Sequence, residues 1–275
     1  MRDDHRNSTI FLTLLVASIT VLTACSGGAA QPPTRRPATE ATKTKDPAPR
    51  SAGENQRTLR GKVIVLDPGH NGSNWAHPSV INAKVDVGNG RKECDTTGTA
   101  SASGYTEHAY TWDVSVRLRK ILRARGAKVV MTRNNDTGVG PCINKRAAIG
   151  NQSRADVALS IHADGAPKSD RGFHIIEPGP VKGHTEKFLR NSRRLGMVLR
   201  AAFLRGTNIP YSNYAGKDAI NVRDDLGGLN LSTVPKVFIE TGNMANPQDI
   251  AKLSDPSFRK RIARSLANGL AAYFA

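Results

Sequence analysis

Short apolar runs alternate with longer amphipathic segments from residue 61 to the C-terminus, a pattern typical of a chain in which strands and helices follow one another. Continuous aliphatic and β-branched runs predict buried strands at 62–67, 127–132, 156–162, 172–177 and 235–240. Apolar positions that recur every three or four residues predict helices at 107–125, 144–154, 185–205 and 256–274. The alternation predicts a single α/β domain whose mostly parallel or mixed sheet carries helices on both faces.

The first 25 residues have the pattern of an export signal. Arg2 and Arg6 precede an uncharged apolar run at 10–22, which is too short to span a bilayer. The run leads into LTAC, which resembles a bacterial lipobox and would make Cys25 the lipidated first residue of the mature protein. The alternative is an ordinary signal peptide cleaved near an incidental cysteine. Either alternative places the protein outside the cytoplasm, in the cell envelope.

Residues 26–59 contain Pro, Thr, Ala and charged residues but almost no aliphatic ones, so they are predicted to form a disordered tether. The folded, catalytic part is then predicted at 60–275. The chain has a net charge of +17, and the folded part carries most of it. No helix-turn-helix or RNA-binding signature accompanies this charge, so we expect no nucleic-acid partner. Anionic envelope polymer or phospholipid headgroups fit an exported basic domain better, and a merely solvated surface remains the simplest interpretation.

Cysteine usage agrees with export. Once Cys25 is set aside, Cys94 and Cys142 remain as a pair in an oxidising compartment, and we predict a disulfide between them. The alternative is two unrelated free thiols. The pair has too few partner cysteines for a structural zinc finger.

Four side chains are predicted to meet at one edge of the sheet. His70 follows the first strand, while His162 and Glu240 each end a strand. Glu107 opens the first helix, which must begin at the same edge. Because the carboxyl ends of strands form the ligand-binding edge of open α/β sheets, the four positions predict one site.

The residue types suit a zinc hydrolase. We assign His70, Glu107 and His162 as ligands of one Zn²⁺, which leaves a coordination position for the water that acts as nucleophile. Glu240 is then the general base, and later the acid that protonates the leaving nitrogen. Taken singly, each His is more often an ordinary loop residue, and Glu107 is favoured by the helix dipole alone. Glu240 is the strongest single candidate because a carboxylate after a buried strand needs a partner or a function.

The chain from about 61 to 275 resembles the zinc-dependent N-acetylmuramoyl-L-alanine amidases of bacterial cell walls, catalytic type three. The similar stretches are VIVLDPGHNG, GYTEHAYTWDVSVRLRKILRARGAKVVMTRNND, NKRAAIGNQSRADVALSIHADG, VPKVFIETGNMANPQDIAKL and RIARSLANGLAAY. The resemblance places His70, Glu107 and His162 on the zinc ligands and Glu240 on the catalytic glutamate. It implies a twisted mixed sheet of about six strands, and hydrolysis of the amide between N-acetylmuramic acid and L-alanine in peptidoglycan or its muropeptide fragments.

Other residues carry weaker expectations. Asp67 and Asp164 are candidates to orient His70 and His162, although each is more often a turn residue. Arg146 is a candidate for binding a substrate carboxylate, with a structural ion pair as an equal alternative. The long segment 71–103 is expected to be an ordered flap or specificity loop, since the disulfide would fasten it. Thr241-Gly242-Asn243-Met244 departs from the family's usual Gly-Phe after the catalytic glutamate and could change the wall beside it.

Two other functions share these features. A zinc carboxypeptidase or other peptidase acting on peptidoglycan stem peptides would use the same ligands but needs a cationic carboxylate pocket. An envelope-binding lipoprotein would keep the fold without catalysis, which the complete ligand set and Glu240 argue against.

Overall fold

A computed structural model describes residues 58–275. The predicted signal peptide at 1–25, Cys25 and almost all of the predicted tether lie outside the described residues. Leu59, which we assigned to the end of the tether, is completely buried in the core, so the fold begins slightly before the predicted boundary. Within 58–275, none of the helices combines the length and apolar character that a bilayer-spanning helix requires.

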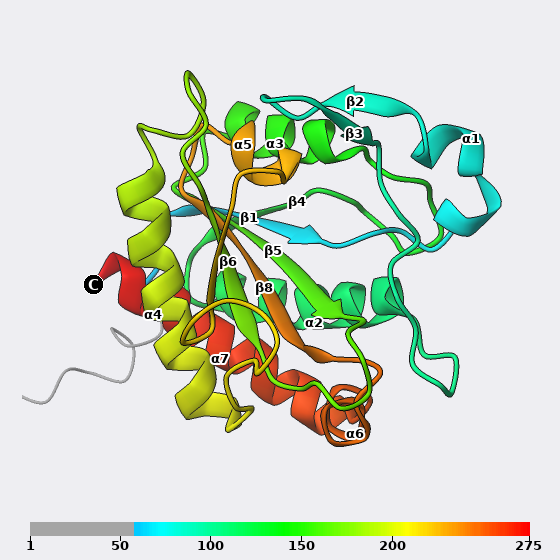
Figure 1. Ribbon diagram of the computed structural model, residues 1–275. Coiled ribbons are helices and arrows are strands. Elements are labelled where there is room, and N and C mark those ends of the chain that lie inside the picture. The colour runs from blue at the N-terminus through cyan, green and yellow to red at the C-terminus, as the bar shows by residue number, and fades with distance from the viewer. Residues whose placement is uncertain (1–57) are drawn as a thin grey trace, which may run out of the picture. The chain divides into compact units, whose positions relative to one another are not determined.

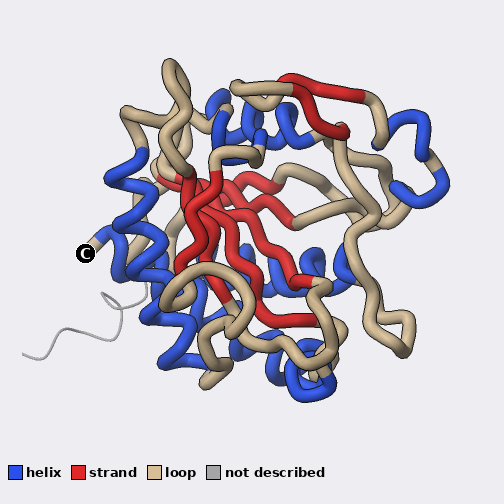
Figure 2. The backbone as a smooth tube through the Cα atoms, viewed as in Figure 1, coloured by secondary structure: helices blue, strands red, loops and turns tan. Residues whose placement is uncertain are grey.

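The centre of the fold is a six-stranded mixed sheet, in the order β4-β1-β5-β8-β6-β7 (Figures 1 and 2). Its strands are β1 (Val63–Pro68), β4 (Lys128–Met131), β5 (Val157–Asp164), β6 (His174–Pro178), β7 (Ile220–Arg223) and β8 (Lys236–Asn243). β4, β1, β5 and β8 pair in parallel. β6 is antiparallel to β8, because a loop without a helix reverses the chain after β5. The predicted α/β class and mixed sheet are confirmed.

Helices cover both faces of the sheet, as Figure 1 shows. One face carries α2 (Glu107–Ala124), α4 (Leu189–Thr207) and α7 (Pro256–Phe274), and the other carries the shorter α3 (Ile143–Gln152) and α5 (Gly227–Asn230). Smaller elements complete the fold: η1 (Asn74–Ala76), α1 (Pro78–Ile81), α6 (Pro247–Leu253) and a separate antiparallel pair, β2 (Lys84–Asp86) with β3 (Arg91–Glu93).

Alternate strand residues face different environments. Val157, Leu159 and Ile161 of β5 join the large core under α2, α4 and α7. Ala158 belongs to a much smaller apolar cluster on the opposite face. Ser160 and His162 follow it on that face, since side chains alternate along a strand. Because α3 and α5 are short, the end of this second face that carries His162 is left open for a site.

The elements that the sequence pattern missed are short or polar. β7 is an edge strand that reads INVR, and its Val222 is 60% exposed, so it has neither an apolar run nor a buried alternation. Segment 71–103, for which no element was predicted, contains η1, α1, β2 and β3. The predicted strands ending at His162 and Glu240 in fact continue to Asp164 and Asn243, so both residues lie inside their strands.

Candidate active site

Strand order places the candidate residues side by side along one edge of the sheet. His70 follows β1, and the neighbouring strands β5 and β8 carry His162 and Glu240, which are paired in register. Glu107 is the first residue of α2, which begins at the same edge. The structure therefore brings all four predicted residues to one place.

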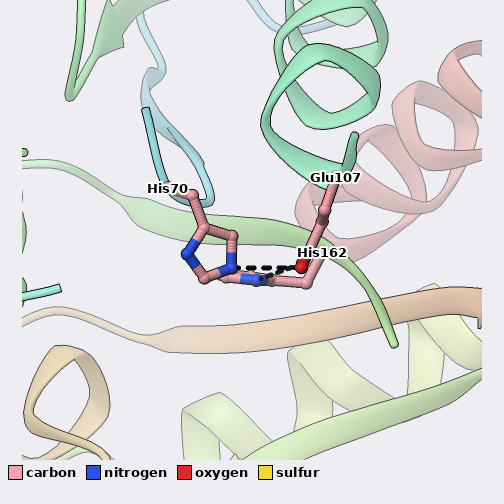
Figure 3. A group of neighbouring side chains, drawn as sticks. All are labelled: His70, Glu107 and His162. Carbon is pink, nitrogen blue, oxygen red and sulfur yellow. Dashed lines mark hydrogen bonds and ion pairs between the residues drawn. The ribbon is translucent and has the colours of Figure 1, made fainter. Parts of the chain in front are cut away.

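Three of the four side chains converge closely (Figure 3). Nε2 of His70 lies 3.2 Å from Oε2 of Glu107, and Nδ1 of His162 lies 2.9 Å from Oε1 of the same carboxylate. One ligand atom from each residue lies within 4.8 Å of the other two. The two imidazole rings are perpendicular, with centroids 5.1 Å apart. Two imidazoles and a carboxylate at these separations form a donor set that suits a tetrahedral metal.

The carboxylate of Glu107 is fixed by the backbone as well as by the histidines. The amide of Thr99 donates to Oε2 at 3.0 Å, and the amide of Ala163 donates to Oε1 at 3.2 Å. Burial by itself would raise the pKa of Glu107, but His70 and His162 hold it well below its usual range. The group is therefore a carboxylate at any physiological pH.

His70 has an unusual backbone, with a left-handed φ of 57° just after β1. This conformation turns its side chain back over the strand end. Nδ1 donates to the carbonyl oxygen of Thr96 at 3.1 Å and lies 3.4 Å from Oδ1 of Asp95. Burial would lower the pKa of His70, but Glu107 and Asp95 raise it to about 10. These contacts leave Nε2 as the atom directed at Glu107 and available to a metal.

Glu240 differs from Glu107 in having no fixed partner. It is partly exposed, and its buried Oε2 has no hydrogen-bond partner among the described residues. Burial, with repulsion from Glu107 and Asp164, raises the pKa of Glu240 well above its ordinary value. A carboxyl group with a raised pKa and a free oxygen is suited to take up and release a proton during a reaction.

The four residues line a cavity of about 300 Å³, together with Thr99, Asp164 and Arg223. A second cavity of the same volume adjoins it and shares His70, His162, Leu226 and Phe238. The ring of Phe238 stacks on that of His162, with centroids 5.3 Å apart. The imidazole is thus held between the Phe238 ring and the Glu107 carboxylate.

Comparisons with known proteins identify the family. The sequence profile of the family described as N-acetylmuramoyl-L-alanine amidase matches residues 64–272. The chain belongs to this family. It is 38% identical over 226 residues to the N-acetylmuramoyl-L-alanine amidase Rv3717 of Mycobacterium tuberculosis, covering 82% of this chain and 91% of the relative.

Solved structures of amidases have the same fold. The crystal structure of Ami1 from Mycobacterium smegmatis superimposes with a TM-score of 0.74 at 38% identity, over 78% of this chain and 98% of the other. The apo form of Ami1 from Mycobacterium abscessus gives a TM-score of 0.73 at 39% identity, over 79% and 100%. The predicted family is confirmed, and the chain is an enzyme of the amidase type.

The expectation that Asp67 orients His70 was wrong for this amidase. Asp67 is buried on the α3 face and accepts from Arg146 at 3.0 Å and from Lys236 at 2.9 Å, besides the hydroxyls of Thr132 and Ser160. Asp67 follows Val65 by two residues, so its side chain points to the same face, toward α3, while His70 lies beyond the strand end. The carboxylate next to Nδ1 of His70 is Asp95.

Arg146 has the structural role that we left open. Its buried guanidinium forms ion pairs with Asp67 and Asp95, both at 3.0 Å, and donates to the carbonyl of His70 at 3.0 Å. These contacts occupy the donors that a substrate carboxylate would need. Asp164 does not pair with His162 either; it accepts from the Tyr214 hydroxyl at 3.2 Å and lies near enough to Glu240 to raise its pKa.

The predicted disulfide joins Cys94 to Cys142, with a Cα–Cα distance of 4.3 Å. Cys142 is the N-cap residue of α3, and the amide of Ile143 donates to the carbonyl of Cys94 at 2.7 Å. Segment 71–103 is also tied to the loop after β7, where Asn89 donates to the carbonyl of Asp224 at 2.7 Å. It is therefore an ordered wall of the site, as expected.

Residues 241–244, which depart from the family's usual pattern, are not among those that line the cavity. Thr241 is fully buried on the opposite face, where its hydroxyl lies 2.7 Å from that of Tyr110 and donates to the carbonyl of His162 at 2.8 Å. The side-chain amide of Asn243 donates to three backbone carbonyls of the 166–170 loop. These contacts attach β8 to α2 and to that loop, so they support the strand that carries Glu240.

Asp95, Phe238 and His174 were missed as site residues. Phe238 and Glu240 are two residues apart on β8, a period that places both on the same face, so the sequence held a signal for Phe238. His174 pairs with Glu240 across β6 and β8, and burial lowers the pKa of its ring to about 4, so a neutral imidazole lies beside the base. Asp95 had no local signal, because the disulfide and α3 bring it to His70.

Proposed function

We propose that the protein is a zinc-dependent amidase that hydrolyses the bond between N-acetylmuramic acid and L-alanine in peptidoglycan. The single observation that carries this proposal is the convergence of His70, Glu107 and His162, with the partnerless Glu240 in the same cavity. Family membership supports the choice of bond, because a related enzyme that covers most of this chain is named for it.

The donor set fits one Zn²⁺ ion. His70 would bind through Nε2, His162 through Nδ1 and Glu107 through a carboxylate oxygen, which are the atoms that already point at one another. A bound Zn²⁺ would polarise the amide carbonyl and lower the pKa of a coordinated water from 15.7 to about 7. The Nδ1 contacts of His70 and the backbone amides on Glu107 hold the ligand side chains in place before the metal arrives.

Glu240 supplies the proton transfers. As a carboxylate it accepts a proton from the attacking water, and its raised pKa favours holding that proton until it is passed on. It then donates the proton to the alanine nitrogen as the carbon–nitrogen bond breaks, which prevents expulsion of an unprotonated amine. The Phe238 ring lines the same cavity as this carboxyl group, and the neutral His174 ring is paired with Glu240 in the register of β6 and β8.

We also propose an exported location in the cell envelope, since the 1–25 pattern and the proposed substrate agree. Lipid anchoring through Cys25 is part of this proposal, and it rests on LTAC alone.

Muropeptide mass spectrometry tests the reaction. Purified protein with zinc should release intact stem peptides from peptidoglycan and leave a free lactyl carboxyl on the muramic acid. Shortened stems that remain attached to the sugar would instead show the peptidase alternative. That alternative needs a free cationic pocket, and Arg223, the arginine in this cavity, is already paired with both oxygens of Asp225. Metal analysis of the purified protein should find about one zinc per chain, and its absence would contradict the metal assignment.

A further inference from the structure

A third cavity, of about 240 Å³, lies beside the metal-ligand cluster and is used by no step described above. It is lined mainly by segments 71–75 and 97–100 and by the start of α2. Trp75, on η1, stands at this cavity with 73% of its surface exposed, the largest exposed fraction among the big apolar side chains of residues 58–275. The segment that carries it lies between β1 and α1, cyan at the right of Figure 1.

One stretch of backbone separates this cavity from the active site. Gly98 and Thr99 line both cavities, and a Cβ on Gly98 would lie 2.6 Å from Cδ2 of His70. Two consecutive residues of α2 belong to the two different sites: Glu107 points into the metal-ligand cluster, while His108 lines the new cavity. A ligand that passes over the 98–99 stretch would therefore occupy both cavities at once.

The lining suits a neutral, hydroxyl-rich ring. Three threonines line the cavity, namely Thr97, Thr99 and Thr106, and within residues 58–275 His108 is the one acidic or basic side chain that lines it. Nδ1 of His108 lies 2.9 Å from Asp136, which is itself paired with Arg133, so Nε2 remains available to a ligand hydroxyl. An exposed indole offers a flat apolar surface to the C–H face of a pyranose. The volume lies below the roughly 300–1,000 Å³ of pockets for drug-sized molecules, which suits a single sugar ring.

Strand order indicates which part of the substrate lies here. Across the sheet edge, Trp75 and His70 follow β1, His162 is on β5 and Glu240 is on β8. The general acid must lie next to the leaving nitrogen, so the stem peptide extends toward Glu240 and Arg223. The acyl side of the bond, which carries the sugar, then extends the opposite way, toward Gly98 and Trp75.

The geometry points to a glycan subsite: the Trp75 cavity binds an N-acetylhexosamine ring of the glycan strand whose muramic acid carries the scissile bond. This assignment rests on the proposed amidase function and adds the direction in which the substrate lies across the site. Trp75 supplies the stacking surface, and His108 and the threonines supply hydrogen bonds to the sugar.

Binding of a peptide-free probe tests the subsite. The β-1,4-linked tetramer of N-acetylglucosamine, titrated by calorimetry into the zinc-loaded protein, should bind the native chain. Trp75→Ala should weaken binding about tenfold or more, as expected for loss of an aromatic anchor, while Trp75→Phe should restore part of it. Val80→Ala, at a 45% exposed position on α1 outside the cavity, is the matched control and should change nothing.

Hydrolysis of N-acetylmuramoyl-L-alanyl-D-isoglutamine is measured in parallel. If the native protein cleaves this amide but does not bind the tetramer, or if Trp75→Ala binds it as well as the native chain does, the subsite is wrong and the proposed function stands. If the tetramer binds through Trp75 but no amide is cleaved, the proposed function fails and the cavity remains a sugar site. A similar loss of tetramer affinity in Val80→Ala would show a general effect on the fold and overturn the assignment to Trp75.

Discussion

Oδ1 of Asp95 lies 3.4 Å from Nδ1 of His70, and its other oxygen accepts from Arg146 at 3.0 Å. A carboxylate on the far nitrogen of a metal-binding imidazole fixes the ring and makes the near nitrogen a better donor. Asp95 thus connects the proposed zinc ligand to the buried ion pairs on α3.

Removing that carboxylate should weaken zinc binding. Asp95→Asn keeps the shape of the side chain but loses its charge, and we expect zinc affinity to fall about 10–100-fold. Competition with a fluorescent chelator measures this directly, without reference to activity. The control is Glu93→Gln, a nearby exposed residue that pairs with Lys84, and its affinity should match that of the native chain. An unchanged affinity in Asp95→Asn would show that the Thr96 carbonyl alone orients His70.

Glu240→Gln should separate proton transfer from metal binding. The amide is nearly the same size but cannot accept the proton, so kcat should fall by about 10²–10⁴-fold. Zinc content should stay the same, because Glu240 is not among the converging ligand atoms. Glu186→Gln, at an exposed position, is the control for the substitution itself. Native-like turnover by Glu240→Gln would remove Glu240 from the mechanism.

The disulfide should contribute to stability and to the site. It closes a loop with a sequence separation of 48 residues, and the chain-entropy relation gives a contribution of about 4 kcal/mol to the free energy of unfolding. Urea unfolding of the Cys94→Ser/Cys142→Ser variant should show a loss of about 2–5 kcal/mol. Cys94 directly precedes Asp95 in the chain, so zinc affinity should also fall. A stable double-serine variant with native zinc affinity would contradict both expectations.

Acid should destabilise the fold through Asp67. Burial would raise the pKa of Asp67, but Lys236 and Arg146 together hold it well below its usual range. In the unfolded chain this carboxyl has a pKa near 3.9, so as the pH falls it binds a proton before the same group in the folded chain does. The contribution of Asp67 to the free energy of unfolding is therefore complete above about pH 5 and is lost as the pH falls through 4 and below.

Urea unfolding between pH 3 and 7 measures this effect. Asp67→Asn should be less stable by about 3–5 kcal/mol at pH 7, because buried Lys236 loses the carboxylate that it pairs with and Arg146 is left with Asp95. Its stability should also vary less with pH below 4 than that of the native chain. Asp86→Asn, at an exposed position on β2, should keep the native pH dependence.

Cys25 remains a prediction from sequence, since it lies outside the described residues. Cys25→Ser should move the protein from the membrane fraction to the soluble envelope fraction of cells that express it, because one serine cannot carry the lipid. Equal distribution of the two proteins would favour the ordinary signal peptide.

The sequence by itself determined most of the fold. Apolar runs predicted the strands that became β1, β4, β5, β6 and β8, and recurring apolar positions predicted α2, α3, α4 and α7, because burial of an apolar face leaves a strong local pattern. It also placed His70, Glu107, His162 and Glu240 together, since strands that run in the same direction must end at one edge.

Tertiary structure alone decided what surrounds that cluster. Asp95 reaches His70 only because a disulfide and Arg146 hold it there. Asp67, which is much closer to His70 in sequence than Asp95 is, points to another face and stabilises α3 and β8 instead. The Trp75 cavity likewise forms between segments that share no period. Such contacts join residues far apart in the chain through packing and charge, and neither leaves a repeating trace in the order of amino acids.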